Sequence, residues 1–134
     1  MTRIYFAHAV SDYNTDWERA ALARINEMFP AHAGFDIVNP NGEEHDAAYK
    51  EQGMAYFHDL CKGCDGVIWA PFPDDSVGAG VYSEVTVFAS SGKTVYALDR
   101  ALGIAQNVKP DLTKVLDVEG TRAKIRHYRS LPQV

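Results

Sequence analysis

The chain predicts an α/β fold, with one domain over residues 1–134 and a doubly wound, mainly parallel sheet of about five strands, Rossmann-like or flavodoxin-like. Short apolar runs rich in strand-forming residues alternate with segments of helical spacing. Such alternation favours parallel strands with helices on both faces of the sheet. With 134 residues, of which 46% are hydrophobic, the chain can bury a single core.

The first elements are a strand and a helix. The apolar run at residues 3–8 predicts the strand. Thr15 and Glu18 then have the spacing of a capping box, and apolar residues recur at helical spacing after them. Pro30 and Gly34 end this helix.

The second strand, residues 35–39, ends at a loop that begins with Pro40, and a helix of moderate regularity follows at 45–62. The rest of the chain predicts, in order, a strand at 67–71, a helix from about 80 to 91 closed by Gly92, a strand at 94–98, a loop at 99–110, a fifth strand at 115–118 and a closing helix at 121–131.

Charge and hydropathy argue against two classes of partner. The formal net charge is −5, and no run of Lys and Arg occurs before the last fifteen residues. Because phosphate backbones select basic faces, we expect no polynucleotide partner. The longest apolar stretches have only the length of strands, so we expect neither a signal peptide nor a membrane span, and a cytoplasmic protein.

Cys61 and Cys64 form a lone C-x-x-C pair. A thioredoxin-type pair opens a helix, whose amino end lowers the thiol pKa, whereas these two cysteines close one. A zinc site needs two more ligands, and no second pair has a suitable spacing, although His58 is near in sequence. We interpret the pair as structural, with redox or metal chemistry as the alternative.

The segment Ser76-Val-Gly78-Ala-Gly80 lies where a buried strand turns into a helix. In an open α/β sheet this is the carboxyl edge, where ligands bind. Glycines let backbone amides approach a bound group, and the helix dipole favours a phosphate or carboxylate. The spacing is neither a P-loop nor a dinucleotide fingerprint. An ordinary strand-to-helix turn is the alternative.

Glu84 lies about one helical turn beyond this segment. A carboxylate there can point into the same crevice, where partial desolvation suits it to nucleophilic attack or to base catalysis. The alternative is an ordinary charge in the first turn of a helix, which the helix dipole favours.

Several of these motifs occur together in one known family. They are Ile4-Tyr5-Phe6 in the first strand, Asp59-Leu60 before Cys64-Asp65, Ser76 to Gly80 followed by a glutamate, and Gly92-Lys93-Thr94-Val95. This set resembles the nucleoside 2-deoxyribosyltransferase superfamily, which includes the 2′-deoxynucleoside 5′-monophosphate N-glycosidases. The resemblance covers roughly residues 3–98.

The resemblance implies three catalytic residues. In the family a glutamate attacks C1′ of the deoxyribose, an acidic residue assists departure of the base, and a tyrosine of the first strand orients the glutamate. Carried over by motif, these residues are Glu84, Asp59 and Tyr5. A close carboxylate stabilises an oxocarbenium-like transition state, so the chemistry is physically sound. The family requires no metal, and we expect no cofactor.

The resemblance also bears on the substrate. Transferases typically carry an aspartate just before the Val-Gly-x-Gly turn, whereas monophosphate glycosidases carry a serine, which can donate a hydrogen bond to a phosphate. Ser76 occupies this position, with the amides of Gly78 and Gly80 beside it, and favours a nucleoside monophosphate. Asp74 and Asp75 oppose a phosphate dianion unless they point away or bind the sugar.

Two spacings depart from the family pattern. Three residues separate Gly80 from Glu84 where relatives usually have one, which turns the glutamate by about 200° on a regular helix. Asp59 precedes Asp65 by six positions where the family's acid does so by eight, and Phe57 occupies the expected place. Both carboxylates take part only if local shifts compensate, so a binding relative without catalysis is an open alternative.

Further substrate contacts are predicted at the same edge. Asn39 and Asn41 follow the second strand, and their amides can read the hydrogen-bonding edge of a base. His8 ends the first strand and points to the same edge. The alternatives are ordinary loop chemistry for the asparagines and a satisfied structural histidine.

We therefore expect an N-glycosidase that hydrolyses the base–sugar bond of a (deoxy)nucleoside 5′-monophosphate through Glu84. The alternatives are a nucleoside 2-deoxyribosyltransferase that exchanges bases and a nucleotide-binding module without catalysis. Family members assemble as dimers or higher oligomers in which a neighbour completes the site. The resemblance therefore implies a homodimer or higher homo-oligomer.

Overall fold

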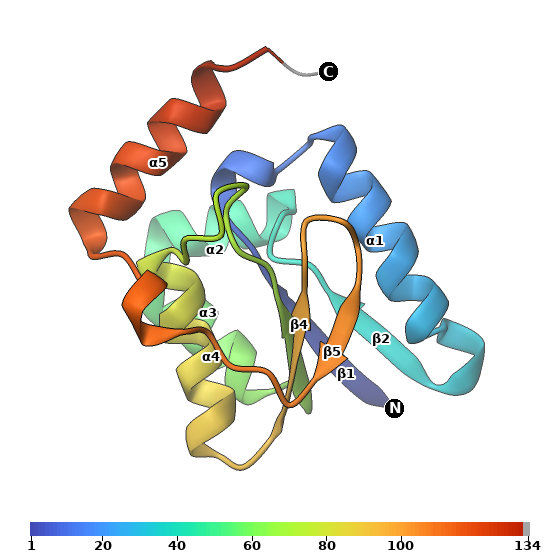
Figure 1. The fold of residues 1–134 in the computed structure, drawn as a ribbon. Coiled ribbons are helices and arrows are strands. Elements are labelled where there is room, and N and C mark those ends of the chain that lie inside the picture. Colours follow the sequence, from blue (N-terminus) through green and yellow to red (C-terminus); the bar gives the residue numbers. More distant parts are fainter. Residues whose placement is uncertain (133–134) are drawn as a thin grey trace.

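The computed structural model describes residues 1–132, which form a five-stranded sheet flanked by helices (Figure 1). The strands are β1 (Thr2–Ala7), β2 (Phe35–Val38), β3 (Gly66–Trp69), β4 (Thr94–Leu98) and β5 (Ile104–Gln106). The helices are α1 (Asp16–Met28), α2 (Glu43–Gln52), α3 (Met54–Lys62), α4 (Ala79–Ser90) and α5 (Val118–Ser130), with 3₁₀ turns η1 (Val10–Asp12), η2 (Ala31–Ala33) and η3 (Leu112–Lys114). None of the helices described is long and apolar enough to cross a membrane.

The strands follow the order β2-β1-β3-β4-β5. The first four run parallel, and β5 pairs with β4 in the antiparallel sense. The predicted α/β fold with a mainly parallel sheet of five strands is therefore confirmed. The chain reverses its winding direction between β1 and β3, and at such a point the connections leave the strand ends on opposite faces and open a crevice.

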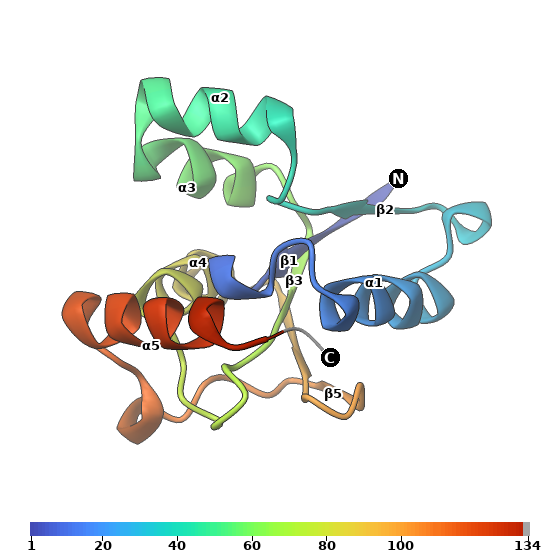
Figure 2. The ribbon, with the colours of Figure 1, turned by 90° about the horizontal axis from the view of Figure 1, so that it is seen from above.

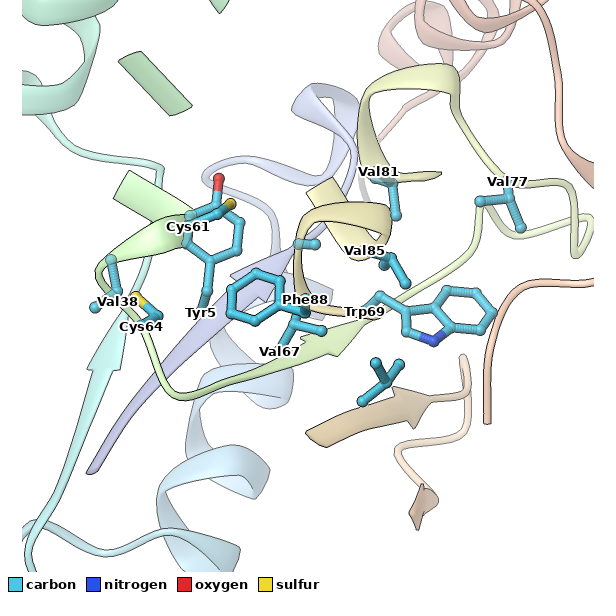
Figure 3. Packing of buried hydrophobic residues seen from close by; sticks show 12 residues of the cluster. Tyr5, Val38, Cys61, Cys64, Val67, Trp69, Val77, Val81, Val85 and Phe88 are labelled. Atoms are coloured by element: carbon cyan, nitrogen blue, oxygen red, sulfur yellow. The ribbon is translucent and has the colours of Figure 1, made fainter. Parts of the chain in front are cut away.

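Apolar side chains fill both faces of the sheet. Helix α1 lies on one side, and α3 and α4 lie on the other (Figure 2). Side chains of a strand alternate between faces, so Phe6 packs beneath α1 with Ile25, whereas Tyr5 packs on the other face with Phe88. Figure 3 shows this second cluster, in which Cys61 lies beside the Tyr5 ring. The two-sided core fixes the position of β1, which supplies residues to the site.

The predicted cap of α1 is confirmed. The Thr15 hydroxyl accepts a hydrogen bond from the Glu18 amide at 3.1 Å. The reciprocal half of a capping box is displaced by one residue, because the Glu18 carboxylate accepts from the Asn14 amide at 3.0 Å instead of from that of Thr15. This displacement turns the Glu18 side chain towards the end of β1.

The helix predicted at 45–62 is two helices, α2 and α3. They meet at Gly53, whose φ of +70° is incompatible with a continuous right-handed helix. The apolar spacing in this segment was irregular because two helices, and not one, share it. None of the residues of α2 is buried.

The fifth strand lies elsewhere than predicted. Strand β5 falls within the segment predicted as a loop at 99–110, where the Asp99 carboxylate accepts hydrogen bonds from the amides of Ala101 and Gly103, both at 2.9 Å. These bonds close a turn that lets the chain reverse against β4. This hairpin was not predicted because the strands were expected to be separated by segments of helical spacing, and no such segment lies between β4 and β5.

The strand predicted at 115–118 is wrong. Val115 forms only an isolated parallel bridge with Val77. The segment ends there because the Asp117 side chain accepts a hydrogen bond from the Gly120 amide at 2.6 Å and starts α5 at Val118. The predicted closing helix is present and begins three residues earlier than expected.

Candidate functional site

A cleft of about 730 Å³ opens at the carboxyl ends of β1 and β3. Its walls come from β1 and the η1 turn, the loop after β2, helices α2 and α3, the amino end of α4, and α5. Open α/β sheets bind ligands at this position, and the volume is that of a small-molecule site. The cleft is therefore the candidate functional site.

Glu84 reaches the cleft from the second turn of α4, and only 8% of it is exposed. Gly80 and Glu84 are four positions apart, so they lie on the same face of the helix, and both line the cleft. The hydroxyl of the buried Tyr5 on β1 donates a hydrogen bond to Glu84 Oε2. Because α4 already begins at Ala79, the long spacing after Gly80 completes a helical turn and brings the carboxylate back to the cleft.

The second oxygen of Glu84 is free. None of the described residues donates a hydrogen bond to Oε1, and every buried side-chain oxygen and nitrogen among them has a partner. Oε1 is consequently reached by solvent from the cleft. One carboxylate oxygen is thus held by Tyr5, and the other is available to a ligand.

Burial raises the pKa of the Glu84 carboxyl to about 8, against the hydrogen bond from Tyr5, which favours the charged form. Burial and the neighbouring Glu84 charge also raise the pKa of Tyr5, so its phenol keeps its proton and remains the donor. Glu84 is therefore mostly protonated at neutral pH. A carboxyl in this state suits proton transfer or, once ionised, nucleophilic attack.

Glu18 is the centre of a second buried polar group beside the cleft. Its Oε2 lies 2.6 Å from Nε2 of His8, and its Oε1 accepts from the Asn14 amide at 3.0 Å and from Nδ2 of Asn41 at 2.8 Å. Burial disfavours the charged form, but these hydrogen bonds together lower the pKa of Glu18. Glu18 is thus held as a carboxylate that ties α1, β1 and the loop after β2 together.

The imidazole of His8 is fully engaged by this group. Its Nδ1 lies 3.1 Å from the carbonyl oxygen of Phe6 and its Nε2 faces the Glu18 carboxylate, so both ring nitrogens have partners. Its ring stacks on Phe6 with centroids 3.8 Å apart. His8 lines the cleft, but its side chain is fully buried, so it supports the wall and leaves ligand contacts to its neighbours.

Tyr13, which the sequence analysis did not single out, lies in the same wall. Its ring is 5.0 Å from that of His8, and its hydroxyl makes no hydrogen bond with any described residue. Burial and the charges of Glu84 and Glu18 raise the pKa of Tyr13, so it remains a neutral donor facing the cleft. Its place in the loop after the first strand was the available signal, because such loops form the binding edge.

Helix α5 forms a further wall through Thr121, Ile125 and Arg129. The helix is anchored where the Thr121 hydroxyl accepts the Ala79 amide at 2.8 Å, at the amino end of α4. Arg129 is exposed and brings a cation to the cleft. A site built from residues 3–98 alone, as the resemblance covers, would lack this wall.

Ser76 does not line the cleft. Its hydroxyl donates to Asp74 at 2.5 Å, and Asp74 in turn pairs with Lys124 of α5. Burial raises the pKa of Asp74, but the bonds from Lys124 and Ser76 together outweigh it and lower that pKa to about 2. Lys114 pairs with Asp75 at 3.3 Å. The structure therefore uses Ser76 to attach α5, and both aspartates have cationic partners.

Asp59 also lies outside the cleft. Its side chain is 72% exposed and sits 3.8 Å from Lys62. Phe57, two residues earlier and about 200° away around α3, lines the cleft instead and packs on Tyr49 with ring centroids 5.3 Å apart. The spacing difference at Asp59, unlike that at Glu84, is not compensated.

Asn39 has a local role, because its Oδ1 accepts the Asn41 amide at 3.0 Å and closes the turn after β2. Of the site residues predicted from sequence, the structure brings six to the cleft: Tyr5, His8, Asn41, Gly78, Gly80 and Glu84. It leaves three outside the lining: Asn39, Asp59 and Ser76.

The two cysteines are buried and are not bonded to each other. Burial raises the pKa of the Cys61 thiol, and Cys64 Sγ donates to the Leu60 carbonyl at 3.4 Å. Across residues 1–132 there is no group of three or more His, Cys, Asp and Glu side chains that could hold a metal ion. The pair packs in the core at the carboxyl end of α3, on the face of the sheet that carries Tyr5 (Figure 3).

Comparison of the chain with protein-family models, with curated proteins and with solved structures gives no match.

Proposed function

We propose that the protein hydrolyses the N-glycosidic bond of a nucleoside 5′-monophosphate, with Glu84 as the nucleophile. One observation carries the proposal: Glu84 is buried at the cleft, one oxygen is held by Tyr5, and the other faces the solvent of the cleft. This is the arrangement that the family resemblance implies for these two residues. It is present although the spacing before Glu84 differs from the family pattern.

In the proposed reaction, ionised Glu84 Oε1 attacks C1′ of the sugar as the C1′–N bond breaks and the base leaves with the bonding electrons and a proton. Water then attacks C1′ of the resulting ester, its proton returns to the Tyr13 oxygen that protonated the base, and the sugar phosphate and the Glu84 carboxylate are released. Tyr5 keeps its proton and orients Oε2. Tyr13, in place of the exposed Asp59, is the neutral donor available to the departing base.

A monophosphate is favoured by charge at the α5 side of the cleft. Arg129 supplies a cation, and the amino end of α4 supplies backbone amides at Gly80. Asp74 and Asp75 oppose an anion less than their number implies, because Lys124 and Lys114 neutralise them. Ser76 lies outside the cleft, so Arg129, and not the serine hydroxyl, is the proposed phosphate contact.

Product analysis tests the proposal. The purified protein is incubated with ribo- and deoxyribonucleoside 5′-monophosphates and with the matching nucleosides, each with and without a different free base, and products are separated by chromatography. We expect free base and sugar phosphate from a monophosphate. Exchange of bases on nucleosides without release from monophosphates would establish the transferase alternative and reject hydrolysis.

A nucleotide-binding module is the second candidate, and the exposure of Asp59 favours it, because the cleft then lacks the carboxylic acid that the family uses for the leaving base. Such a module raises its melting temperature with a monophosphate but forms no product. A ligand-induced shift together with unchanged nucleotide after long incubation would select this reading.

A further inference from the structure

The orientation of the Asn41 amide is set by chemistry. Glu18 Oε1, at 2.8 Å, can only accept because the pKa of Glu18 is lowered and the group is a carboxylate. The group of Asn41 that faces it is therefore the NH₂. The same nitrogen lies 3.1 Å from Oδ1 of Asn14. Two acceptors thus hold the amide nitrogen, and the carbonyl oxygen of Asn41 must point away from them.

That oxygen is unused by the protein. Asn41 lines the cleft, and no described residue donates a hydrogen bond to its Oδ1. The loop that carries Asn41 is itself fixed, since Asn39 Oδ1 accepts a hydrogen bond from the backbone N–H of Asn41 at 3.0 Å. Asn41, a lining residue of the cleft, therefore carries a free acceptor whose identity cannot be exchanged by rotating the side-chain amide, because rotation would place a carbonyl oxygen against the Glu18 carboxylate.

We propose that Asn41 Oδ1 reads the base of the ligand and selects bases with an exocyclic amino group over their oxo counterparts. Glu18 is the positioning residue that fixes the amide, and the inference rests on the proposed function in assigning a nucleobase to this cleft. An amino group donates to Oδ1, whereas an oxo group in the same place sets two acceptors against each other. We expect a preference of about fivefold, the value of one net hydrogen bond at a partly exposed site.

Matched ligand pairs test the selection on the wild-type protein. The pairs are adenine with hypoxanthine, adenosine 5′-monophosphate with inosine 5′-monophosphate, and cytidine 5′-monophosphate with uridine 5′-monophosphate. Dissociation constants are measured by calorimetry, and the amino member of a pair that binds is expected to bind more tightly. Equal affinities, or a preference for the oxo member, would overturn the inference.

Two variants test the residues assigned. Asn41→Leu removes the acceptor and is expected to bring the amino-to-oxo ratio to about one. Glu18→Gln leaves Asn41 in place but lets its amide turn over, so the same ratio falls by several-fold. Asn26→Leu is the matched control, because Asn26 is exposed on α1 and binds only the Leu22 carbonyl. Each ratio compares two ligands on one protein, so a general loss of stability does not imitate the effect.

The free bases separate this inference from the proposed reaction. Selective binding of adenine over hypoxanthine with no cleavage of any monophosphate would reject the hydrolase and leave the assignment of Asn41 intact. Cleavage of adenosine and inosine monophosphates with equal kcat/KM, unaltered by Asn41→Leu, would reject the assignment and leave the hydrolase intact. Failure of every base and monophosphate to bind would reject both.

Discussion

Glu84 and Glu18 are both buried glutamates at one edge of the same sheet, yet their pKa values move in opposite directions. Glu84 receives one side-chain hydrogen bond, from Tyr5, and burial dominates. Glu18 receives bonds from His8, Asn14 and Asn41, and these outweigh burial. Glu84 also lies deeper in the protein than Glu18, so its deeper burial and the larger number of donors to Glu18 together decide which glutamate is charged at neutral pH.

The difference separates two roles. Both carboxylate oxygens of Glu18 are hydrogen-bonded to the protein and hold three segments together. Glu18 is therefore a structural carboxylate. Glu84 has one oxygen left over and a carboxyl that is only partly ionised, so it retains capacity for a ligand. Buried carboxyls that have few hydrogen-bond donors, and therefore a raised pKa, are typical of functional sites.

The largest expected effect comes from removing the ionisable group of Glu84, the glutamate with a free oxygen. Glu84→Gln keeps the shape of the side chain but removes the proposed nucleophile, so the proposed hydrolysis of the best monophosphate should fall at least about a thousandfold, while binding of the ligand persists. Initial rates and dissociation constants measure the two quantities. Turnover within a few-fold of the wild type would contradict the assignment of Glu84.

The contributions of Glu18 and Glu84 to the free energy of unfolding should depend on pH in opposite ways. Glu18→Gln should destabilise the protein by about 2 kcal/mol at pH 7, because charge-assisted hydrogen bonds are lost. The pKa of folded Glu18 lies below its unfolded value, so its contribution is present above the unfolded pKa and disappears as pH falls through the folded one. Urea unfolding at a series of pH values measures both effects.

Glu84→Gln should behave in the opposite way. The pKa of folded Glu84, about 8, lies above its unfolded value, so wild-type stability falls as pH rises from the unfolded pKa through about 8. The glutamine variant avoids this loss and should be the more stable protein at pH 9, with little difference at pH 5. The same unfolding series serves, and a variant destabilised equally at both pH values would contradict the raised pKa.

A smaller effect is expected from removing the single donor to Glu84. In the wild type kcat/KM should rise with pH through about 8 as Glu84 ionises. Tyr5→Phe removes the bond that favours the carboxylate, so the midpoint should move to higher pH and the rate at pH 7 should fall about tenfold. A pH–rate profile measures the shift. An unchanged midpoint would mean that Tyr5 does not tune Glu84.

The smallest effect is expected at Asp59. Because its side chain is exposed and outside the cleft, Asp59→Asn should change kcat/KM by less than about twofold. Tyr13→Phe, which removes a donor inside the cleft, is the companion variant and should lower the rate more. A large loss from Asp59→Asn would show that α3 rearranges when ligand binds.

Much of the fold was predictable because strands and helices carry periodic patterns. The four parallel strands and the capped helix α1 follow directly from those patterns. Strand β5 was missed because it has only three residues and depends on hydrogen bonds to Asp99, and α2 and α3 were merged because Gly53 resembles an ordinary helical position until its φ is known.

The site was predictable to the extent that it depends on strand ends. Tyr5, His8 and Gly78 lie where a parallel sheet must place them. Asp59 and Ser76 were misplaced because their orientation depends on helix phase and on a pairing with Lys124, fifty positions away from Asp74. From the sequence Glu18 was interpreted only as a capping residue. Its place beside the cleft was missed, because only the tertiary structure shows that its carboxylate reaches His8.

Helix α2 is a weakly packed part of the wall of the cleft. It contributes Glu43, Asp46 and Tyr49 to the lining, yet it buries none of its residues and is joined to α3 through Gly53. A segment with so little buried surface unfolds locally at a small fraction of the global free energy, so its amide hydrogens should exchange with solvent long before those of β1 or α4. Opening of α2 is thus a route by which a ligand can enter the cleft, and a bound ligand should be recognised by slowed exchange in α2.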